Sequence, residues 1–460
     1  MPSRRIRVVP AAALRAGFEA IRAEAGVPER FPAGVEAEAE AAAAAAGSAG
    51  DRERVDVPFV TIDPPGSRDL DQALHIERRG DGPRVRYAIA DVSAFVTRGG
   101  ALDRDTHDRG VTVYAPDEKA PLHPPVLSEG AASLLPGVWR PAVLWTFDLD
   151  ATGAPAAVDV RRAEVRSTAQ HTYEDVPAEV AELLAEVGER RLALERARGG
   201  VRLAVPEQEV VQEDGSWTVH YRVPLATEEH NAQISLLTGM AAAALMLRGG
   251  TGILRTQAPP SERALARLRR QAAALDVDWP DELPYPEFVR GLDPAVPAHA
   301  AVMHEATGVG GAAGYTVFDG EPPAAAGHFA VAADYAHATA PLRRLQDRFV
   351  SECCLAACTG DPVPDWVRAA LPELPKAMSA GNHRAGQVER GVVDLVEAAV
   401  LSGREGERFE AIVIDEGLVQ LREPAVRGRL EDGGPPPGRA VTVRLRTADV
   451  RARTVAFTAA

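Results

Sequence analysis

The order of the expected secondary structure most constrains the fold of this chain. Segments of β-rich or alternating composition come mostly first, and longer segments with helical spacing follow them. Strands first and helices later favour an α+β domain over a doubly wound parallel sheet. We expect strands at residues 57–62, 85–92, 143–149 and 217–223, and helices at 178–198, 229–247, 261–275, 342–357 and 383–401.

The two ends of the chain differ from this central region, which we place at residues 51–402. Residues 11–25 have helical spacing and residues 34–46 are an Ala/Glu run, so residues 1–50 are predicted to form a small helical module, with a helix-turn-helix as one form of it. A Gly-Ser-Ala-Gly linker is predicted at 47–50. Residues 403–460 hold four short strand candidates, which indicate a small closed β-barrel of the OB type; they are 409–413, 418–421, 441–445 and 454–457.

Composition and charge exclude several classes of protein. The net charge of −15 argues against a general nucleic-acid coat and permits only a local basic channel. The three cysteines crowd residues 353–358, so a disulfide scaffold is not expected and a cytoplasmic location is predicted. The longest apolar run, near residues 240–247, is far shorter than the ~18 residues that span a bilayer, and no membrane association is predicted.

The choice of basic residue says nothing about function by itself, whereas one glycine-rich string bears on cofactors. Of the 51 basic residues 49 are arginine, and lysine stands only at positions 119 and 376. The glycine-rich string at 308–314 has no strand before it, so no nucleotide cofactor is predicted. The sequence gives no prediction of oligomeric partners.

Three aspartates lie within nine residues, in a segment that follows a predicted strand. Asp63 ends the β-rich run, and Asp69 and Asp71 follow in a turn rich in Pro, Gly and Ser. Carboxylates that come close repel one another unless a divalent cation neutralises them, and oxygen-only ligands suit Mg²⁺ or Mn²⁺ at sites that act on phosphates. Asp91, at the end of the next strand, is a candidate neighbour. The alternative is a solvated turn whose Asp side chains bond local amides.

A pair of arginines stands at a predicted helix start. Thr339 is a candidate cap and Pro341 suits the first helical position, which places Arg343 and Arg344 in the first turn. Cations are normally disfavoured at that end of a helix, so two arginines there favour a bound anion such as phosphate. The alternative is a solvated ion pair between Arg343 and Asp347.

Together these segments resemble the RNB family, the catalytic domain of ribonuclease II and ribonuclease R. Residues 61–73 are similar to the family's metal segment, TIDxxxxxDxDDA, and residues 327–344 to its GHF…YxHxTSPIRR segment. Further similarity lies at 89–93, 109–114, 121–128 and 133–140, and the resemblance runs from about residue 57 to 401. It implies an RNB-type catalytic domain over residues 51–402, followed by an OB-fold RNA-binding domain of the ribosomal-protein S1 kind at 403–460.

The resemblance implies a hydrolytic exoribonuclease that digests RNA processively from the 3′ end to 5′-mononucleotides, with Mg²⁺ or Mn²⁺. It assigns Asp63, Asp69 and Asp71 to the metal, with Asp71 also acting in catalysis. It assigns Arg343 to the charge on the scissile phosphate. The implied substrate-binding residues are Gln72, Tyr114, Arg140, Arg344 and Glu389.

The sequence departs from the family pattern at several points. Gln72 stands at the family's fourth acidic position, and residues 231–240 lack an acidic pair that the corresponding helix usually carries. The family's two N-terminal cold-shock barrels do not fit into the first ~55 residues. Gln72 supports an alternative, an inactive RNA-binding or regulatory protein that keeps the fold. A metal-dependent phosphatase of another fold is a second alternative, for which the OB-like end would be superfluous.

Overall fold

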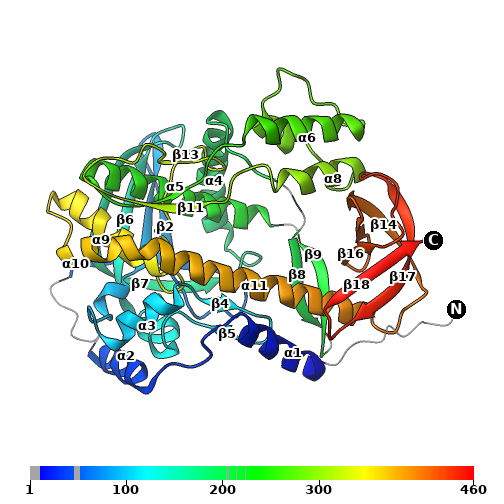
Figure 1. The fold of residues 1–460 in the computed structure, drawn as a ribbon. Helices are drawn as coiled ribbons and strands as arrows, with labels where there is room; N and C mark the ends of the chain where they lie inside the picture. Colours follow the sequence, from blue (N-terminus) through cyan, green and yellow to red (C-terminus); the bar gives the residue numbers. More distant parts are fainter. Residues whose placement is uncertain (1–10, 46–51, 204, 206, 214, 223) are drawn as a thin grey trace.

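The computed structural model describes residues 11–45, 52–203, 205, 207–213, 215–222 and 224–460, so the predicted linker at 47–50 lies outside the described residues. Two closed β-barrels lie toward opposite ends of the molecule, and the long helix α11 (Leu374–Leu401) runs between them (Figure 1). Helices and strands are both present, and the α+β prediction is confirmed.

The first barrel contains β1 (Arg54–Ile62), β2 (Gln72–Arg79), β3 (Gly82–Ala90), β6 (Trp139–Leu149) and β7 (Pro155–His171), in that order. Neighbouring strands are antiparallel, and β1 and β7 pair in parallel to close the barrel, with Ile62 opposite His171. Trp145 and Phe147 of β6 are fully buried in an apolar cluster that includes Leu184, Ile234 and Phe349 of the surrounding helices. The barrel brings the end of β1 and the start of β2 to the same rim, and the aspartate segment joins them there.

Three helices pack around this barrel: α4 (Ala178–Ala197), α5 (Ala226–Gly249) and α9 (Leu345–Thr359). Helix α5 contacts both of the others, and α9 contacts β7. By length and composition α5 passes a test for crossing a membrane, but 56% of its most apolar window is buried inside the protein. A buried core helix passes the same test.

The two predicted N-terminal helices are present and pack on different elements. Helix α1 (Ala11–Glu24) packs on α11, whereas α2 (Ala33–Ala45) packs on α3 (Ala101–Arg109). Phe18 of α1 belongs to an apolar cluster that also includes side chains of α11 and of the C-terminal barrel. The domain boundaries after residues 50 and 402 stay predictions.

The C-terminal barrel has five strands: β14 (Arg408–Asp415), β15 (Leu418–Leu421), β16 (Arg427–Leu430), β17 (Ala440–Asp449) and β18 (Thr454–Ala459). Their order is β14-β15-β16-β18-β17, and β14 pairs with β17 to close the barrel. The predicted OB-type barrel is confirmed, with β16 as a fifth strand that the sequence did not indicate. A Cβ at Gly428 in β16 would lie 2.5 Å from the Phe457 ring, so only glycine lets this strand lie over the core.

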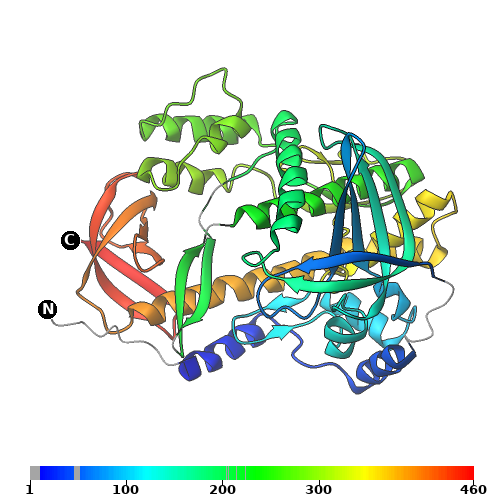
Figure 2. The same cartoon turned by 180° about the vertical axis from the view of Figure 1, so that it is seen from behind.

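A β-hairpin lies between the barrels, and several smaller elements surround them. The hairpin, β8 (Glu207–Glu213) and β9 (Ser216–Arg222), packs against α11 (Figure 2). Near it, α8 (Pro297–Ala306) packs on α6 (Glu262–Ala274) and on β14. The remaining elements are β4 (Val113–Tyr114), β5 (Lys119–Ala120), β10 (Thr251–Thr256), α7 (Tyr285–Arg290), β11 (Gly314–Asp319), β12 (Gly327–His328), β13 (Ala333–Asp334) and α10 (Asp365–Ala370).

Candidate active site

The aspartate segment is fixed at both ends and near its middle. Asp63 N–H donates to the His171 carbonyl at 3.0 Å, which ties the end of β1 to β7. Near the other end, Leu70 N–H donates to Ser133 Oγ at 3.0 Å, and the Ser133 hydroxyl donates to the Arg68 carbonyl. The segment is therefore held by distant parts of the chain, unlike a turn that is stabilised only by local bonds.

Asp71 connects this segment to the arginine pair. Its carboxylate is buried and accepts a hydrogen bond from Leu342 N–H at 2.7 Å and another from Arg343 Nε at 3.2 Å. Burial raises the pKa of Asp71 to about 7, and the Arg343 guanidinium and the Leu342 amide oppose that rise. Asp71 and Arg343 are 272 positions apart in the sequence, so only the folded chain brings them together.

The arginine pair lies before the helix, and the predicted helix start at Pro341 is wrong. The N–H groups of Arg343 and Arg344 donate to the Ala340 carbonyl in a turn, and α9 begins at Leu345. Asp347 accepts a hydrogen bond from Ala340 N–H at 2.8 Å and fixes this turn against the first turn of α9.

The two arginines face different partners. Arg344 forms an ion pair with Asp347, with 2.7 Å between Nη2 and Oδ2, and its guanidinium is directed at that buried carboxylate. Arg343 keeps a side chain that is 43% exposed and contacts Asp71. The alternative ion pair between Arg343 and Asp347 is therefore wrong, because Arg344 pairs with Asp347 and Arg343 pairs with Asp71. The predicted role of Arg344 in binding substrate does not agree with its position.

Asp69 is held by two donors from one β-ribbon. Tyr114 of β4 and Lys119 of β5 are cross-strand neighbours, and the Tyr114 hydroxyl and Lys119 Nζ donate to Asp69 at 3.0 and 2.7 Å. Burial alone would raise the pKa of Asp69, but these two donors hold it below its ordinary value. Lys119 Nζ also lies 3.0 Å from Glu129 Oε1. The sequence reasoning did not identify Lys119; its rarity as one of two lysines was the available signal.

Asp63 has the carboxylate oxygen best suited to a metal ion. Its Oδ2 is buried and has no hydrogen-bond partner among the residues that the structure describes. Burial raises the pKa of Asp63 to about 6, against opposing effects from Arg343 and Thr61. A buried, unpartnered carboxylate oxygen among further aspartates fits a hard divalent cation.

The three aspartates lie in one neighbourhood without converging on one point. Within the described parts of the chain, no three or more His, Cys, Asp or Glu side chains form a group that would hold a metal ion together. Asp69 is directed at Lys119, and Asp71 at Arg343. The assignment of all three aspartates to a metal therefore stays a prediction.

Of the other candidate residues, Gln72 and Arg140 contact the surroundings of the aspartate segment, and Asp91 does not. The Gln72 amide donates to the Thr339 carbonyl at 2.5 Å, and Arg140 Nε donates to the Ser133 carbonyl at 3.1 Å, so both support the site. Asp91 does not belong to it, because its carboxylate forms ion pairs with Arg52 and Arg162.

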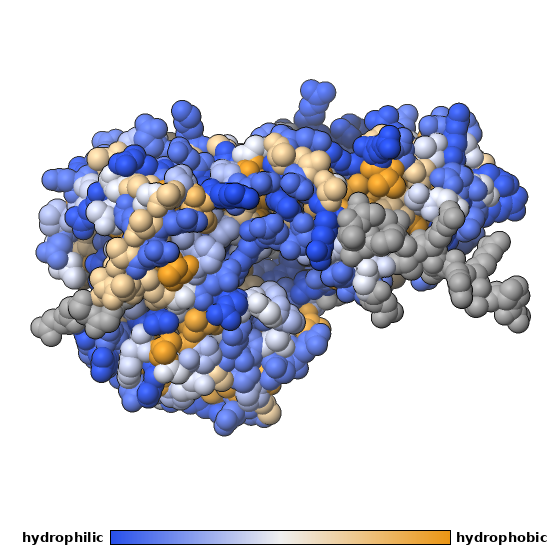
Figure 3. All heavy atoms as spheres, turned by 90° about the horizontal axis from the view of Figure 1, so that it is seen from below, coloured by the Kyte–Doolittle hydropathy of each residue, from blue (hydrophilic) through white to orange (hydrophobic). Residues whose placement is uncertain are grey.

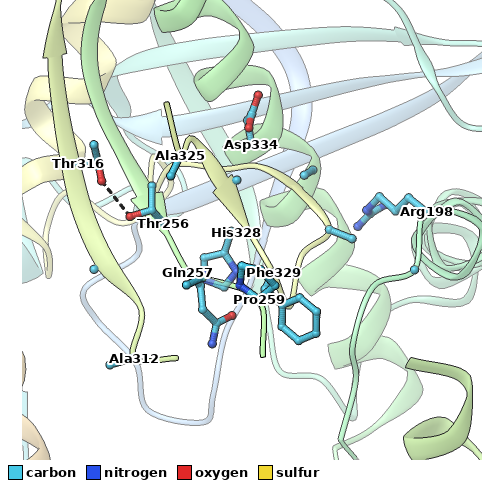
Figure 4. Close-up of a pocket in the computed structure, with 16 residues that line it drawn as sticks. Arg198, Thr256, Gln257, Pro259, Ala312, Thr316, Ala325, His328, Phe329 and Asp334 are labelled. Carbon is cyan, nitrogen blue, oxygen red and sulfur yellow. Dashed lines mark hydrogen bonds between the residues drawn. The ribbon is translucent and has the colours of Figure 1, made fainter. Parts of the chain in front are cut away.

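Two clefts are lined by residues outside the aspartate segment. Tyr114, which is 50% exposed, and Glu389 of α11 line a common cleft of about 480 Å³ with Arg222 of the hairpin. A larger cleft, of about 970 Å³, is lined by residues that include Gln257, His328 and Phe329, and its lining includes none of the three aspartates (Figure 4). Seen from below, the surface is hollowed near its middle, with hydrophilic side chains around the hollow (Figure 3).

Comparison with known proteins places these features in a family. Residues 52–359 match the RNB domain, and residues 407–460 match the RNase II-type exonuclease C-terminal S1 domain. Ribonuclease R of Vibrio cholerae is 26% identical over 433 residues, which cover 84% of this chain and 51% of that protein. Ribonuclease R of Aquifex aeolicus is 28% identical over 398 residues, which cover 80% and 56%. The chain thus spans about half the length of these curated relatives.

Solved structures share the fold. RNase R of Mycoplasma genitalium superimposes with a TM-score of 0.85 at 18% identity, over 96% of this chain and 77% of that one. Yeast Ssd1, described as a pseudonuclease, superimposes with a TM-score of 0.68 at 16% identity, over 84% and 51%. One fold therefore carries both nucleases and a protein without that activity.

Proposed function

Because its residues 52–359 match the RNB domain, this chain belongs to the RNB family, and we propose that it is a hydrolytic exoribonuclease that digests RNA from the 3′ end. The observation that supports the proposal most directly is the contact between Asp71 and Arg343. It joins the aspartate segment to an arginine whose side chain is exposed enough to reach a phosphate. A fold kept only for binding RNA would not need this pairing of a buried carboxylate with a solvent-facing guanidinium.

The proposed chemistry follows from the needs of a phosphodiester. Hydrolysis requires an activated water and stabilisation of the negative charge that develops on the phosphate. When bound, Mg²⁺ or Mn²⁺ would act as a Lewis acid and lower the pKa of a water, and Asp63 and Asp71 are the residues that would hold it. Arg343 has an exposed guanidinium that can donate two hydrogen bonds to phosphate oxygens.

The cleft beside Asp69 suits the end of an RNA strand. The exposed ring of Tyr114 offers a surface on which a base can stack, and such stacking contributes ~1–3 kcal/mol per base. Glu389 lines the same cleft and can accept hydrogen bonds from ribose hydroxyls. We assign these two residues to substrate binding and Arg344 to positioning of the turn that carries Arg343.

RNA is the proposed partner, and 5′-mononucleotides released processively are the proposed products. The C-terminal barrel supports this proposal, because OB folds commonly bind single-stranded nucleic acid. A barrel of this kind, joined to the RNB region by α11, would hold the strand while its 3′ end is digested.

The test is an incubation of RNA labelled at its 5′ end with the protein and Mg²⁺, followed by separation of the products. Progressive shortening with release of mononucleotides supports the proposal, and Asp71→Asn is the matched inactive variant. RNA that is shifted on a native gel but never shortened would favour the inactive RNA-binding alternative, for which Gln72 is the support. Loss of a 5′-phosphate label from intact RNA would instead indicate a phosphatase.

A further inference from the structure

Lys119 occupies a position next to the candidate metal site that the proposed function leaves unexplained. Its Nζ lies 2.7 Å from Asp69 Oδ1 and 3.0 Å from Glu129 Oε1. The Lys119 side chain is 25% exposed and that of Asp69 is 13% exposed, so water screens this contact only partly. Lys119 is thus a fixed positive charge on one of the three aspartates.

The chemistry of lysine suits this position. Nearly all basic residues of the chain are arginine, yet a lysine stands between the two carboxylates. An ammonium group is a compact point charge with three donors, whereas a guanidinium is planar and larger. A compact cation that bonds two carboxylates at once imitates part of what a metal ion does.

Two of the three aspartates already have a cation beside them, so a second metal ion would add unbalanced positive charge. Asp63, Asp69 and Asp71 face two fixed cations, Lys119 on Asp69 and Arg343 on Asp71. Gln72 adds no charge, and its amide nitrogen is bonded to the Thr339 carbonyl. Among the described residues, Asp63 is the aspartate that forms no ion pair and whose Oδ2 has no hydrogen-bond partner, although Arg343 acts on it at longer range.

We propose that Lys119 is a built-in counter-ion of Asp69, and that it limits the aspartate cluster to a single divalent ion, held by Asp63 with Asp71. The inference rests on the proposed function, because it concerns the metal that this function uses. Glu129, which shares Lys119, has Arg68 3.8 Å away, so one net negative charge remains, and one divalent ion more than balances it. A second would place an excess of positive charge in a partly buried site, which is unfavourable.

The test counts metal ions without any RNA. Metal-free protein is titrated with Mn²⁺, and free Mn²⁺ is followed by its electron paramagnetic resonance signal. We expect the wild-type protein to bind one ion. Lys119→Met should bind a second ion, or bind the first about tenfold more tightly, because an opposing charge has been removed. Lys376→Met is the control; Lys376 is exposed at the start of α11, and its replacement should leave the titration unchanged.

A double variant distinguishes a counter-ion from a support of the fold. Lys119→Met with Asp69→Asn removes a neutral pair, so its Mn²⁺ affinity should stay within about threefold of wild type. If Asp69 is itself a ligand, this double variant loses affinity by about tenfold or more, and the inference is overturned. Lys119→Arg keeps the charge and should keep a single ion. Circular dichroism checks that each variant is folded.

The outcome for the metal count is separate from the outcome for the enzyme. A wild-type protein that shortens RNA but binds two Mn²⁺ ions contradicts the inference and leaves the proposed function in place. One that binds a single ion, held by Asp63 with Asp71, but leaves RNA intact supports the counter-ion and contradicts the proposed function. Equal titrations for wild type and Lys119→Met would also overturn the inference.

Discussion

Replacing Asp71 with asparagine should stop RNA digestion and, at the same time, make the metal-free protein more stable at pH 8. The Asp71 side chain is 4% exposed, and burial raises its pKa to about 7 because the charged form loses its hydration. Asparagine has almost the same shape and carries no charge. Its Oδ1 can still accept the hydrogen bond that Leu342 N–H donates to Asp71 at 2.7 Å.

The size of the effect follows from the pKa. The difference between the ordinary value of 3.8 and about 7 corresponds to about 4 kcal/mol, at about 1.4 kcal/mol for each pKa unit. The asparagine NH₂ group would face the Arg343 guanidinium, which loses its acceptor but is exposed enough to turn to water. We subtract about 1–2 kcal/mol for this lost hydrogen bond to a charged group. The expected gain in the free energy of unfolding at pH 8 is then about 2–3 kcal/mol.

The sign of the pH dependence is fixed by the direction of the shift. A carboxyl group whose folded pKa is raised contributes stability below its unfolded pKa, and this contribution is lost as the pH rises through the folded value. The advantage of Asp71→Asn should therefore be largest at pH 8 and close to zero at pH 5. Urea unfolding of both proteins in EDTA at the two pH values measures it.

Two results would refute this reasoning. If Asp71→Asn is no more stable than wild type at pH 8, the charged Asp71 is stabilised by Arg343 by more than its burial costs. If the variant keeps more than about a tenth of the wild-type rate of RNA digestion, Asp71 has no catalytic role. Asp71→Ala is the control for the hydrogen bond, because it leaves Leu342 N–H without its acceptor and should be less stable than Asp71→Asn by about 1–3 kcal/mol.

Three other variants test separate parts of the site and the fold. Arg343→Lys should lower the rate of RNA digestion severely, because an ammonium cannot make the two-point contact of a guanidinium; a harmless Lys beside a harmful Ala would show that only charge matters. Gln72→Asp should lower the Mg²⁺ concentration for half-maximal rate by adding a carboxylate, and no change would place residue 72 outside the metal's surroundings. Burial raises the pKa of Glu397 from 4.5 to about 7, so its stabilising contribution is present below pH 4.5 and lost as the pH rises through 7. Between pH 4.5 and 8 the free energy of unfolding of Glu397→Gln should therefore decline by about 3 kcal/mol less than that of the wild type, as measured by urea unfolding.

The long helices were the most predictable part of the fold. The helix expected at 178–198 is observed as α4, Ala178–Ala197, because its apolar residues repeat with helical spacing over many turns. Helix α11 begins at Leu374, nine residues before its expected start. Pro375 lies in the first turn, where proline is tolerated, and Gly381 lets Val111 pack closely, since a Cβ there would be 3.0 Å from Val111 N. Both residues are read as helix breakers when packing is unknown.

The longest strand, β7, was not predicted from the sequence. Strand β7 has 17 residues, of which many are Arg, Glu, Asp or Ser, so its composition does not indicate a strand. Its charged side chains lie on the outside of the barrel, where Arg166 pairs with Asp56 of β1 and Glu164 pairs with Arg54. Ala163 and Val165 lie on the other face of β7, in an apolar cluster with residues of β1, β3 and β6. Cross-strand charge pairs stabilise this strand, and those pairs depend on a neighbour that the local sequence does not identify.

The candidate site shows where local reasoning stops. The residue types at 63, 69, 71 and 343 were enough to predict a cluster of carboxylates and a phosphate-binding arginine, but not which arginine faces the cluster. A helix that began at Pro341 would place Asp347 one turn from Arg343 and leave Arg344 free. The observed helix begins at Leu345, so Asp347 pairs with Arg344 and Arg343 contacts Asp71. The buried Asp347 also accepts a hydrogen bond from Ala340 N–H, and this contact fixes the turn of residues 340–344 against the first turn of α9. The fold determines this contact, so the spacing of the two arginines in the sequence does not predict it.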